Sequence, residues 1–198
     1  MDLHRVARYA PRAVRESDAR AAAVLAMVID RPSGPHLLFT KRADHLGEHP
    51  GQMAFPGGGR ESWDDTLEAT ALREADEEIG VGAGEVEVVG RLDDIRTVTD
   101  YAVTPFVSRA PDRAYTPDER EVAEVVVLPV AAFTDPGNYR AARREHPEYG
   151  PAIVHYFEVD GYTVWGATGR ILVQLLELTT RWERPSGVDR VVGPDELP

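Results

Sequence analysis

The segment from Gly59 to Val81, GRESWDDTLEATALREADEEIGV, constrains this chain more than any other. In a helix, Glu74, Glu77 and Glu78 occupy positions i, i+3 and i+4 and share one narrow face. Like charges on one face repel each other and weaken an isolated helix. A bound cation removes that repulsion, and carboxylate oxygens are ligands that suit Mg²⁺ or Mn²⁺.

Two neighbouring features favour a metal site over a solvated acidic face. The turn at residues 55–59, FPGGG, comes before the acidic segment and lets the backbone approach a ligand closely. Gly80, directly after the glutamates, is typical of a left-handed helix C-cap. The sequence therefore predicts a loop, a helix and an acidic cluster held at fixed offsets.

This spacing resembles the Nudix box, G-x5-E-x7-R-E-U-x-E-E-x-G-U, in which U is a bulky aliphatic residue. The matching residues are Gly59, Arg73, Glu74, Glu77, Glu78, Gly80 and Val81. Asp65 stands where the family has Glu, and Ala75 stands where it has a larger aliphatic residue. The resemblance implies an α/β protein with the Nudix-type α/β/α sandwich and a mixed β-sheet. It also implies a pyrophosphohydrolase that acts on a nucleoside diphosphate linked to a further group, with Mg²⁺ or Mn²⁺ as cofactor.

The same resemblance suggests roles for individual residues. Glu74, Glu77 and Glu78 are expected to bind the metal, with the turn carbonyl at Gly58 as a further oxygen ligand. Arg73 either orients Glu74 or meets phosphate, or it forms a structural salt bridge to Asp65. We favour the structural role, in which Asp65 and Gly59 support the site.

The catalytic base has three candidates. Glu74 is the one inside the box. Glu121 and Glu124 lie just ahead of an apolar strand at residues 125–127, and Glu121 fits better as a loop residue. An equally good interpretation is that Glu121 and Glu124 are simply two solvated acids.

The residues ahead of the box resemble the coenzyme A pyrophosphatase subfamily. They read LFTKR at 38–42 and HPGQMAFPGG at 49–58, with Gly47 where that subfamily usually has Arg. The resemblance implies that coenzyme A or acyl-coenzyme A is cleaved to 4′-phosphopantetheine, or its acyl form, and adenosine 3′,5′-bisphosphate. The candidate substrate-binding residues are Lys41, Arg42 and His49 for the 3′-phosphate and Gln52 for the pantetheine amide.

Two other functions remain open at this point. One is a pyrophosphohydrolase for ADP-ribose, dinucleotides or oxidised nucleoside triphosphates. The other is a Nudix-fold binding or regulatory protein without turnover, although binding alone would not require three metal ligands. The expected partner is a small nucleotide, and the chain is expected to be a monomer or a homodimer.

Composition narrows the class of protein. The 198 residues suit one domain at 1–183, with an N-terminal helix or arm at 1–20 and a loose tail at 184–198. The absence of Cys excludes disulfides and is compatible with a cytoplasmic location. The net charge of −12 argues against nucleic-acid binding. The longest apolar run, Ala21–Ile29, is too short to span a membrane.

Periodicity and turn residues predict the order of elements. The expected helices are one at Asp64–Ile79 and one from a Thr168 cap to about Trp182. The expected strands are Ala22–Asp30, His36–Lys41, Glu85–Leu92, Tyr101–Ser108, Glu124–Pro129, Ala152–Val159 and Tyr162–Trp165.

Overall fold

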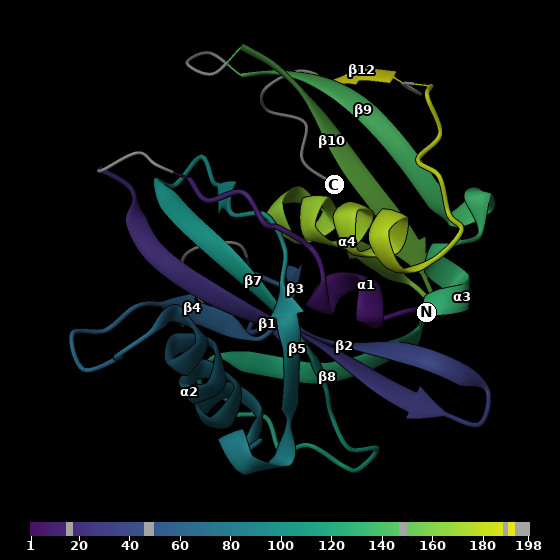
Figure 1. Ribbon diagram of the computed structural model, residues 1–198. Helices are drawn as coiled ribbons and strands as arrows, with labels where there is room; N and C mark the ends of the chain where they lie inside the picture. Colours follow the sequence, from purple (N-terminus) through teal and green to yellow (C-terminus); the bar gives the residue numbers. More distant parts are fainter. Residues whose placement is uncertain (15–17, 46–49, 147–149, 188–189, 193–198) are drawn as a thin grey trace.

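The computed structural model describes residues 1–14, 18–45, 50–146, 150–187 and 190–192. Its larger sheet contains eight strands (Figure 1). These are β1 (Arg20–Arg31), β2 (Gly34–Arg42), β3 (Met53–Ala54), β4 (Gly57–Gly59), β5 (Glu87–Arg91), β6 (Ile95–Arg96), β7 (Tyr101–Arg109) and β8 (Val122–Pro129). β1 pairs in parallel with β7, and the other pairings are antiparallel, so the sheet is mixed as expected.

A smaller sheet holds four strands in the order β11-β10-β9-β12. They are β9 (Tyr139–His146), β10 (Gly150–Val159), β11 (Tyr162–Val164) and β12 (Arg190–Val192). β12 corrects the expectation of a loose tail for three of its residues, which pair in parallel with β9. The short elements are α1 (His4–Ala7), α3 (Val130–Phe133) and the 3₁₀ turns Ala83–Glu85 and Pro136–Asn138.

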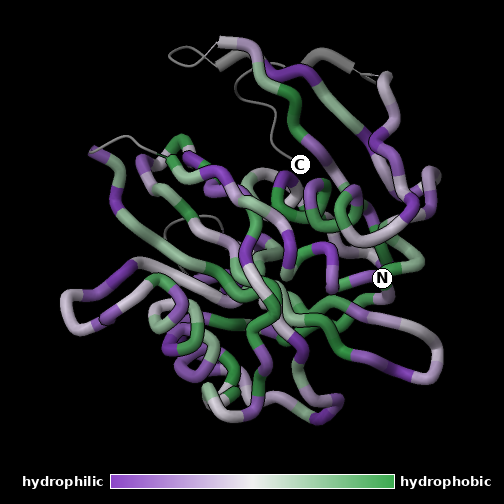
Figure 2. Tube along the Cα trace, in the orientation of Figure 1, coloured by the Kyte–Doolittle hydropathy of each residue, from purple (hydrophilic) through white to green (hydrophobic). Residues whose placement is uncertain are grey.

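The two long helices cover opposite faces of the larger sheet. α2 (Leu67–Ile79) lies on one face, and α4 (Gly166–Thr179) lies between the other face and the smaller sheet (Figure 1). β1 is apolar on both faces: Leu25 and Met27 pack toward α2, whereas Ala26 and Val28 pack in the cluster that contains α4. Figure 2 shows hydrophobic and hydrophilic residues alternating along both helices. This layering confirms the α/β class.

Both long helices begin at other residues than expected. α2 starts at Leu67, three residues after Asp64, because the Thr66 hydroxyl caps it by accepting a hydrogen bond from Ala69 N–H at 3.0 Å. α4 starts at Gly166, so Thr168 lies inside the helix. In the part of the chain that the structure describes, no helix is long and apolar enough to cross a lipid bilayer.

Candidate active site

The loop before α2 brings backbone against the helix. Gly57 has φ +154°, and a Cβ there would lie 2.3 Å from the carbonyl oxygen of Ala23 in β1. Only glycine fits this position, because any side chain would push β4 away from β1. On the facing side of α2, Ala71 and Ala75 are fully buried and let the helix approach the sheet. Small residues on both sides thus hold the turn beside the acidic helix.

Gly58 and Glu74 form the closest part of this contact. A Cβ on Gly58 would lie 2.6 Å from both Cδ and Oε1 of Glu74 and 2.7 Å from Oε2. The carboxylate of Glu74 therefore occupies the space that a side chain at Gly58 would fill. Burial raises the pKa of Glu74, and the neighbouring Arg73 opposes the shift. The predicted metal ligands Gly58 and Glu74 are brought together.

Glu78 is the most enclosed acid of the box. Its side chain is 8% exposed, and within the described residues its Oε2 atom has no hydrogen-bond partner. Burial, reinforced by the charges of Glu74 and Glu121, raises the pKa of Glu78 to about 8. A hydrogen bond from the Gly57 backbone and the charge of Arg42 oppose the shift. A buried carboxylate with a free oxygen is costly unless a cation or a proton compensates it.

Arg73 connects the turn to the glutamates. Its Nε and Nη2 atoms donate to Asp64 Oδ1 and Oδ2, both at 3.0 Å, and Nη2 also donates to the Gly59 carbonyl at 3.0 Å. Nη1 lies 2.9 Å from Glu74 Oε1 and 2.8 Å from Glu77 Oε2. The guanidinium therefore holds both carboxylates from one side, in agreement with an orienting role.

The expected salt bridge from Arg73 to Asp65 is wrong, because Asp64 takes that place. Asp64 is buried, and its Oδ2 also accepts hydrogen bonds from Glu61 N–H at 2.9 Å and from the Thr70 hydroxyl at 3.0 Å. The hydrogen bond from Arg73 holds the pKa of Asp64 well below its usual range. Asp65 faces solvent. Sequence reasoning missed Asp64, although the adjacent acids before Thr66 were a usable signal, since neighbouring side chains point apart.

Glu77 stands apart from the other two glutamates. Its side chain is 60% exposed and bonded to Arg73. Among the residues that the structure describes, no three His, Asp or Glu side chains are already grouped to hold a metal ion. Like charges repel each other, so the three glutamates do not gather in the absence of a bound cation. The residues nonetheless fit Mg²⁺ or Mn²⁺, because the free Glu78 oxygen and the Glu74 carboxylate at the Gly58 backbone form an all-oxygen donor set.

Glu121, one of the three candidate bases, lies on a loop that packs against the end of α2. Asp118 N–H donates to the Glu78 carbonyl at 2.8 Å, and Glu121 follows in the same turn. Glu121 is exposed, yet its charge contributes to the raised pKa of both Glu74 and Glu78, so it lies near them. Glu124 instead accepts a hydrogen bond from the Tyr162 hydroxyl at 2.8 Å, away from this group.

Three of the four expected substrate-binding residues, Lys41, Arg42 and Gln52, lie in the part of the chain that the structure describes. Arg42 lies within electrostatic reach of Glu78 at the end of β2. Lys41 precedes it in the same strand, and the pairing of β2 with β8 is irregular between these two residues. Gln52 accepts the Arg42 N–H at 3.0 Å through its carbonyl, while its side chain approaches Gly166 at the start of α4. His49 and Gly47 lie outside the described residues.

Comparison with known proteins places the chain in a family. Residues 19–149 match the NUDIX domain model, so the chain belongs to the Nudix family. It is a Nudix pyrophosphohydrolase that acts on a pyrophosphate substrate of the small-nucleotide kind, in a family that uses divalent metal ions such as Mg²⁺ or Mn²⁺. Membership among hydrolases disfavours the open alternative of a binding protein without turnover.

Several curated relatives are similar over most of their length. A protein of Escherichia fergusonii, named "Uncharacterized Nudix hydrolase NudL", is 41% identical over 162 residues, covering 79% of this chain and 81% of the relative. The protein of that name in Salmonella newport is 42% identical with the same coverage. Among solved structures, the Nudix hydrolase RenU of M. smegmatis is 23% identical with a TM-score of 0.46, covering 59% of this chain and 74% of its own.

Proposed function

We propose that this enzyme hydrolyses coenzyme A or acyl-coenzyme A to 4′-phosphopantetheine, or its acyl form, and adenosine 3′,5′-bisphosphate. The observation that carries the proposal is the position of Arg42. It lies at the end of β2, where its charge opposes the rise in the pKa of the buried Glu78, and its N–H donates to the Gln52 carbonyl. A cation beside a pyrophosphate-cleaving site suits a substrate with one more phosphate.

Three carboxylates and one carbonyl would hold the metal. We assign Glu74 and Glu78 as the principal ligands, Glu77 as a further ligand and the Gly58 carbonyl as another. When bound, Mg²⁺ or Mn²⁺ supplies positive charge that offsets the glutamates and stabilises the charge developing on the phosphoryl oxygens. Glu77 must turn from the solvent-exposed position in which it meets Arg73.

The remaining residues position these ligands. Asp64 fixes the guanidinium of Arg73 with two hydrogen bonds, and Arg73 in turn fixes Glu74 against the turn. We assign Glu121 as the base, because the Glu74 carboxylate already pairs with Arg73 and packs against the backbone of Gly58. Glu121 accepts a proton from water as the water oxygen bonds to phosphorus. The bond from phosphorus to the bridging oxygen breaks, and that oxygen leaves with the electron pair.

A substrate panel with Mg²⁺ or Mn²⁺ tests this assignment. Coenzyme A, ADP-ribose, NADH, diadenosine polyphosphate and 8-oxo-dGTP are compared by kcat/KM. Dephospho-coenzyme A is the matched control, since it differs only by the 3′-phosphate. We expect coenzyme A to be preferred over dephospho-coenzyme A by about tenfold or more, as for one charge-assisted contact. Equal cleavage of the two, or a clear preference for another member of the panel, overturns the coenzyme A assignment.

Arg42→Gln separates the role of this residue from that of the metal ligands. The substitution should remove most of the preference for coenzyme A over dephospho-coenzyme A and leave the cleavage of dephospho-coenzyme A unchanged. Arg31→Gln is the matched control, because Arg31 pairs with Asp112 on the surface at 2.8 Å. A loss of activity toward both substrates in Arg42→Gln would assign the residue to the pyrophosphate and not to the 3′-phosphate.

A further inference from the structure

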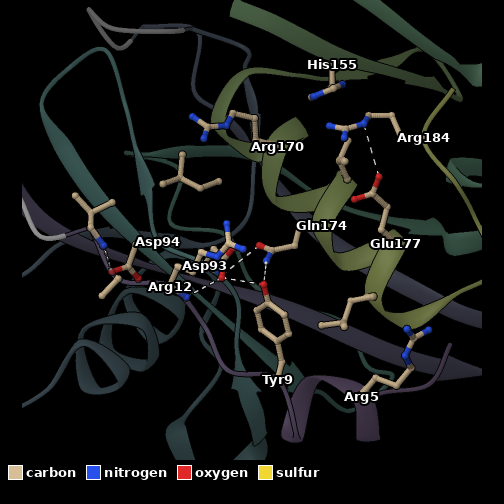
Figure 3. A pocket seen from close by; sticks show the side chains of 15 residues that line it. Arg5, Tyr9, Arg12, Asp93, Asp94, His155, Arg170, Gln174, Glu177 and Arg184 are labelled. Atoms are coloured by element: carbon tan, nitrogen blue, oxygen red, sulfur yellow. Dashed lines mark hydrogen bonds and ion pairs between the residues drawn. The ribbon is translucent and has the colours of Figure 1, made fainter. Parts of the chain in front are cut away.

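A cavity lies on the opposite side of the larger sheet from α2. Its volume is about 750 Å³, within the range of small-molecule sites (Figure 3). The walls come from the N-terminal segment, the loop after β5, strand β10 and helix α4. None of the box glutamates lines it, and neither does Arg42. The cavity is therefore separate from the candidate active site.

One end of the cavity is cationic. Arg170 of α4 and Arg184 supply the positive charge there, and His155 of β10 lies near Arg184 (Figure 3). After burial itself, the charges of Arg184 and Arg170 lower the pKa of His155 to about 4, so the three groups lie within electrostatic reach of one another. The side chain of His155 is held in place, since its Nδ1 atom lies 2.8 Å from the Tyr139 hydroxyl.

Of the two arginines, Arg170 has the positive charge that nearby carboxylates neutralise least. Surrounding protein lowers the pKa of Arg170 by desolvation, although the residue keeps an exposed surface. Its Nη1 atom donates a long hydrogen bond of 3.4 Å to the Arg96 carbonyl, and within the described residues Arg170 has no ion pair. Arg184 has a loose contact, 3.7 Å from Nε to Glu177 Oε1. A partly desolvated guanidinium without a carboxylate gains most from an anion that its planar fork can bind.

The other end of the cavity is a hydrogen-bonded wall. The Tyr9 hydroxyl donates to Asp93 Oδ1 at 3.0 Å and accepts from Gln174 Nε2 at 3.1 Å. Asp93 N–H donates to Gln174 Oε1 at 3.2 Å, and Arg12 N–H donates to Asp93 Oδ1 at 2.8 Å. These bonds fix the N-terminal segment against α4. The wall presents the carboxylate of Asp93, which accepts hydrogen bonds, and the side chains of Arg5 and Arg12 also line the cavity.

We propose that this cavity binds a sugar phosphate, free or as part of a nucleoside monophosphate. Its phosphate lies at Arg170, His155 and Arg184, and its hydroxyls donate to the wall that carries Asp93. A ligand with charge at both ends, such as a tricarboxylate, meets Asp93 and Asp94 at the second wall. A bare anion leaves that wall and most of the volume unused. An anion at one end and hydroxyl donors at the other match the two walls.

Isothermal titration calorimetry in EDTA tests this site without interference from metal-dependent hydrolysis. The probes are ribose 5-phosphate and AMP, with ribose and citrate as controls. We expect one saturable site for at least one of the two phosphates and none for ribose or citrate. Arg170→Gln should weaken this binding by about tenfold or more, as for a charge-assisted bidentate contact. Arg31→Gln removes one surface charge outside the cavity and should leave it unchanged.

Three outcomes overturn the proposal: no saturable binding of either phosphate, binding that is undiminished in Arg170→Gln, or binding that disappears in Arg42→Gln. The last outcome would assign the ligand to the candidate active site. Thermal unfolding checks that Arg170→Gln is folded. Should it fail to fold, Arg184→Gln provides the same test from the other side of the cationic end. Arg170→Lys keeps the charge without the fork and should bind with intermediate affinity.

Discussion

Arg73 and Asp64 are joined by two parallel hydrogen bonds of 3.0 Å, and this pair sets the geometry of the acidic helix face. Bidentate pairs fix direction as well as distance. Asp64 is itself held by the Glu61 backbone and the Thr70 hydroxyl, so its carboxylate is a fixed support for the guanidinium. The orientation of Glu74 therefore depends on a residue that stands one position before the box acid Asp65.

Asp64→Asn should lower kcat by about ten- to a hundredfold, as is usual when a residue that orients metal ligands is changed. The amide keeps the size of the side chain but loses one acceptor and the charge that Arg73 needs. Asp65→Asn is the matched control and should leave kcat unchanged, because Asp65 faces solvent. Steady-state kinetics with saturating Mg²⁺ gives both values. Equal losses in the two variants would contradict the assigned pair.

Gly58→Ala should reduce activity by about a hundredfold or more, since it displaces a principal metal ligand. The new Cβ would lie 2.6 Å from the Glu74 carboxylate, so either that carboxylate or β4 has to move. Gly59→Ala is the control in the next position, because its Cβ meets only the Tyr101 ring at 3.9 Å. Circular dichroism should show both variants folded. A Gly58→Ala enzyme with full activity would remove Glu74 from the metal site.

The box helix, its Gly80 cap and the strands β1 and β2 could be predicted because periodicity and turn residues report local geometry, whereas the order of the strands in the sheet could not. Gly80 indeed has φ +65°. The partner of Arg73 could not be predicted, because Asp64 and Asp65 are chemically alike and only the loop's hydrogen bonds turn the first one inward. The cavity at Arg170 was also beyond sequence reasoning. It joins residues from the N-terminal segment, β10 and α4 that are brought together only by tertiary packing.

Lowering the pH should destabilise the protein through His155. The pKa of this residue is lowered from its usual value near 6.5 to about 4, by burial first and then by Arg184 and Arg170. The unfolded chain thus binds a proton between these values that the folded protein does not, and stability falls as pH falls. At about 1.4 kcal/mol per pKa unit the full loss approaches about 3 kcal/mol. His155→Gln should show a flatter urea-unfolding profile between pH 6.5 and pH 4.

Raising the pH should destabilise the metal-free protein through Glu78, whose pKa is raised to about 8 from a usual value near 4.5. Between these values the folded protein keeps a proton that the unfolded chain has released, so stability falls as pH rises and the loss is complete above pH 8. Urea unfolding in EDTA measures this slope, which should largely disappear in Glu78→Gln. Mg²⁺ at pH 8 should raise the melting temperature of the wild type and leave Glu78→Gln unchanged, because a ligand that binds only the folded state stabilises it. Equal stabilisation of both proteins by Mg²⁺ would place the metal away from Glu78.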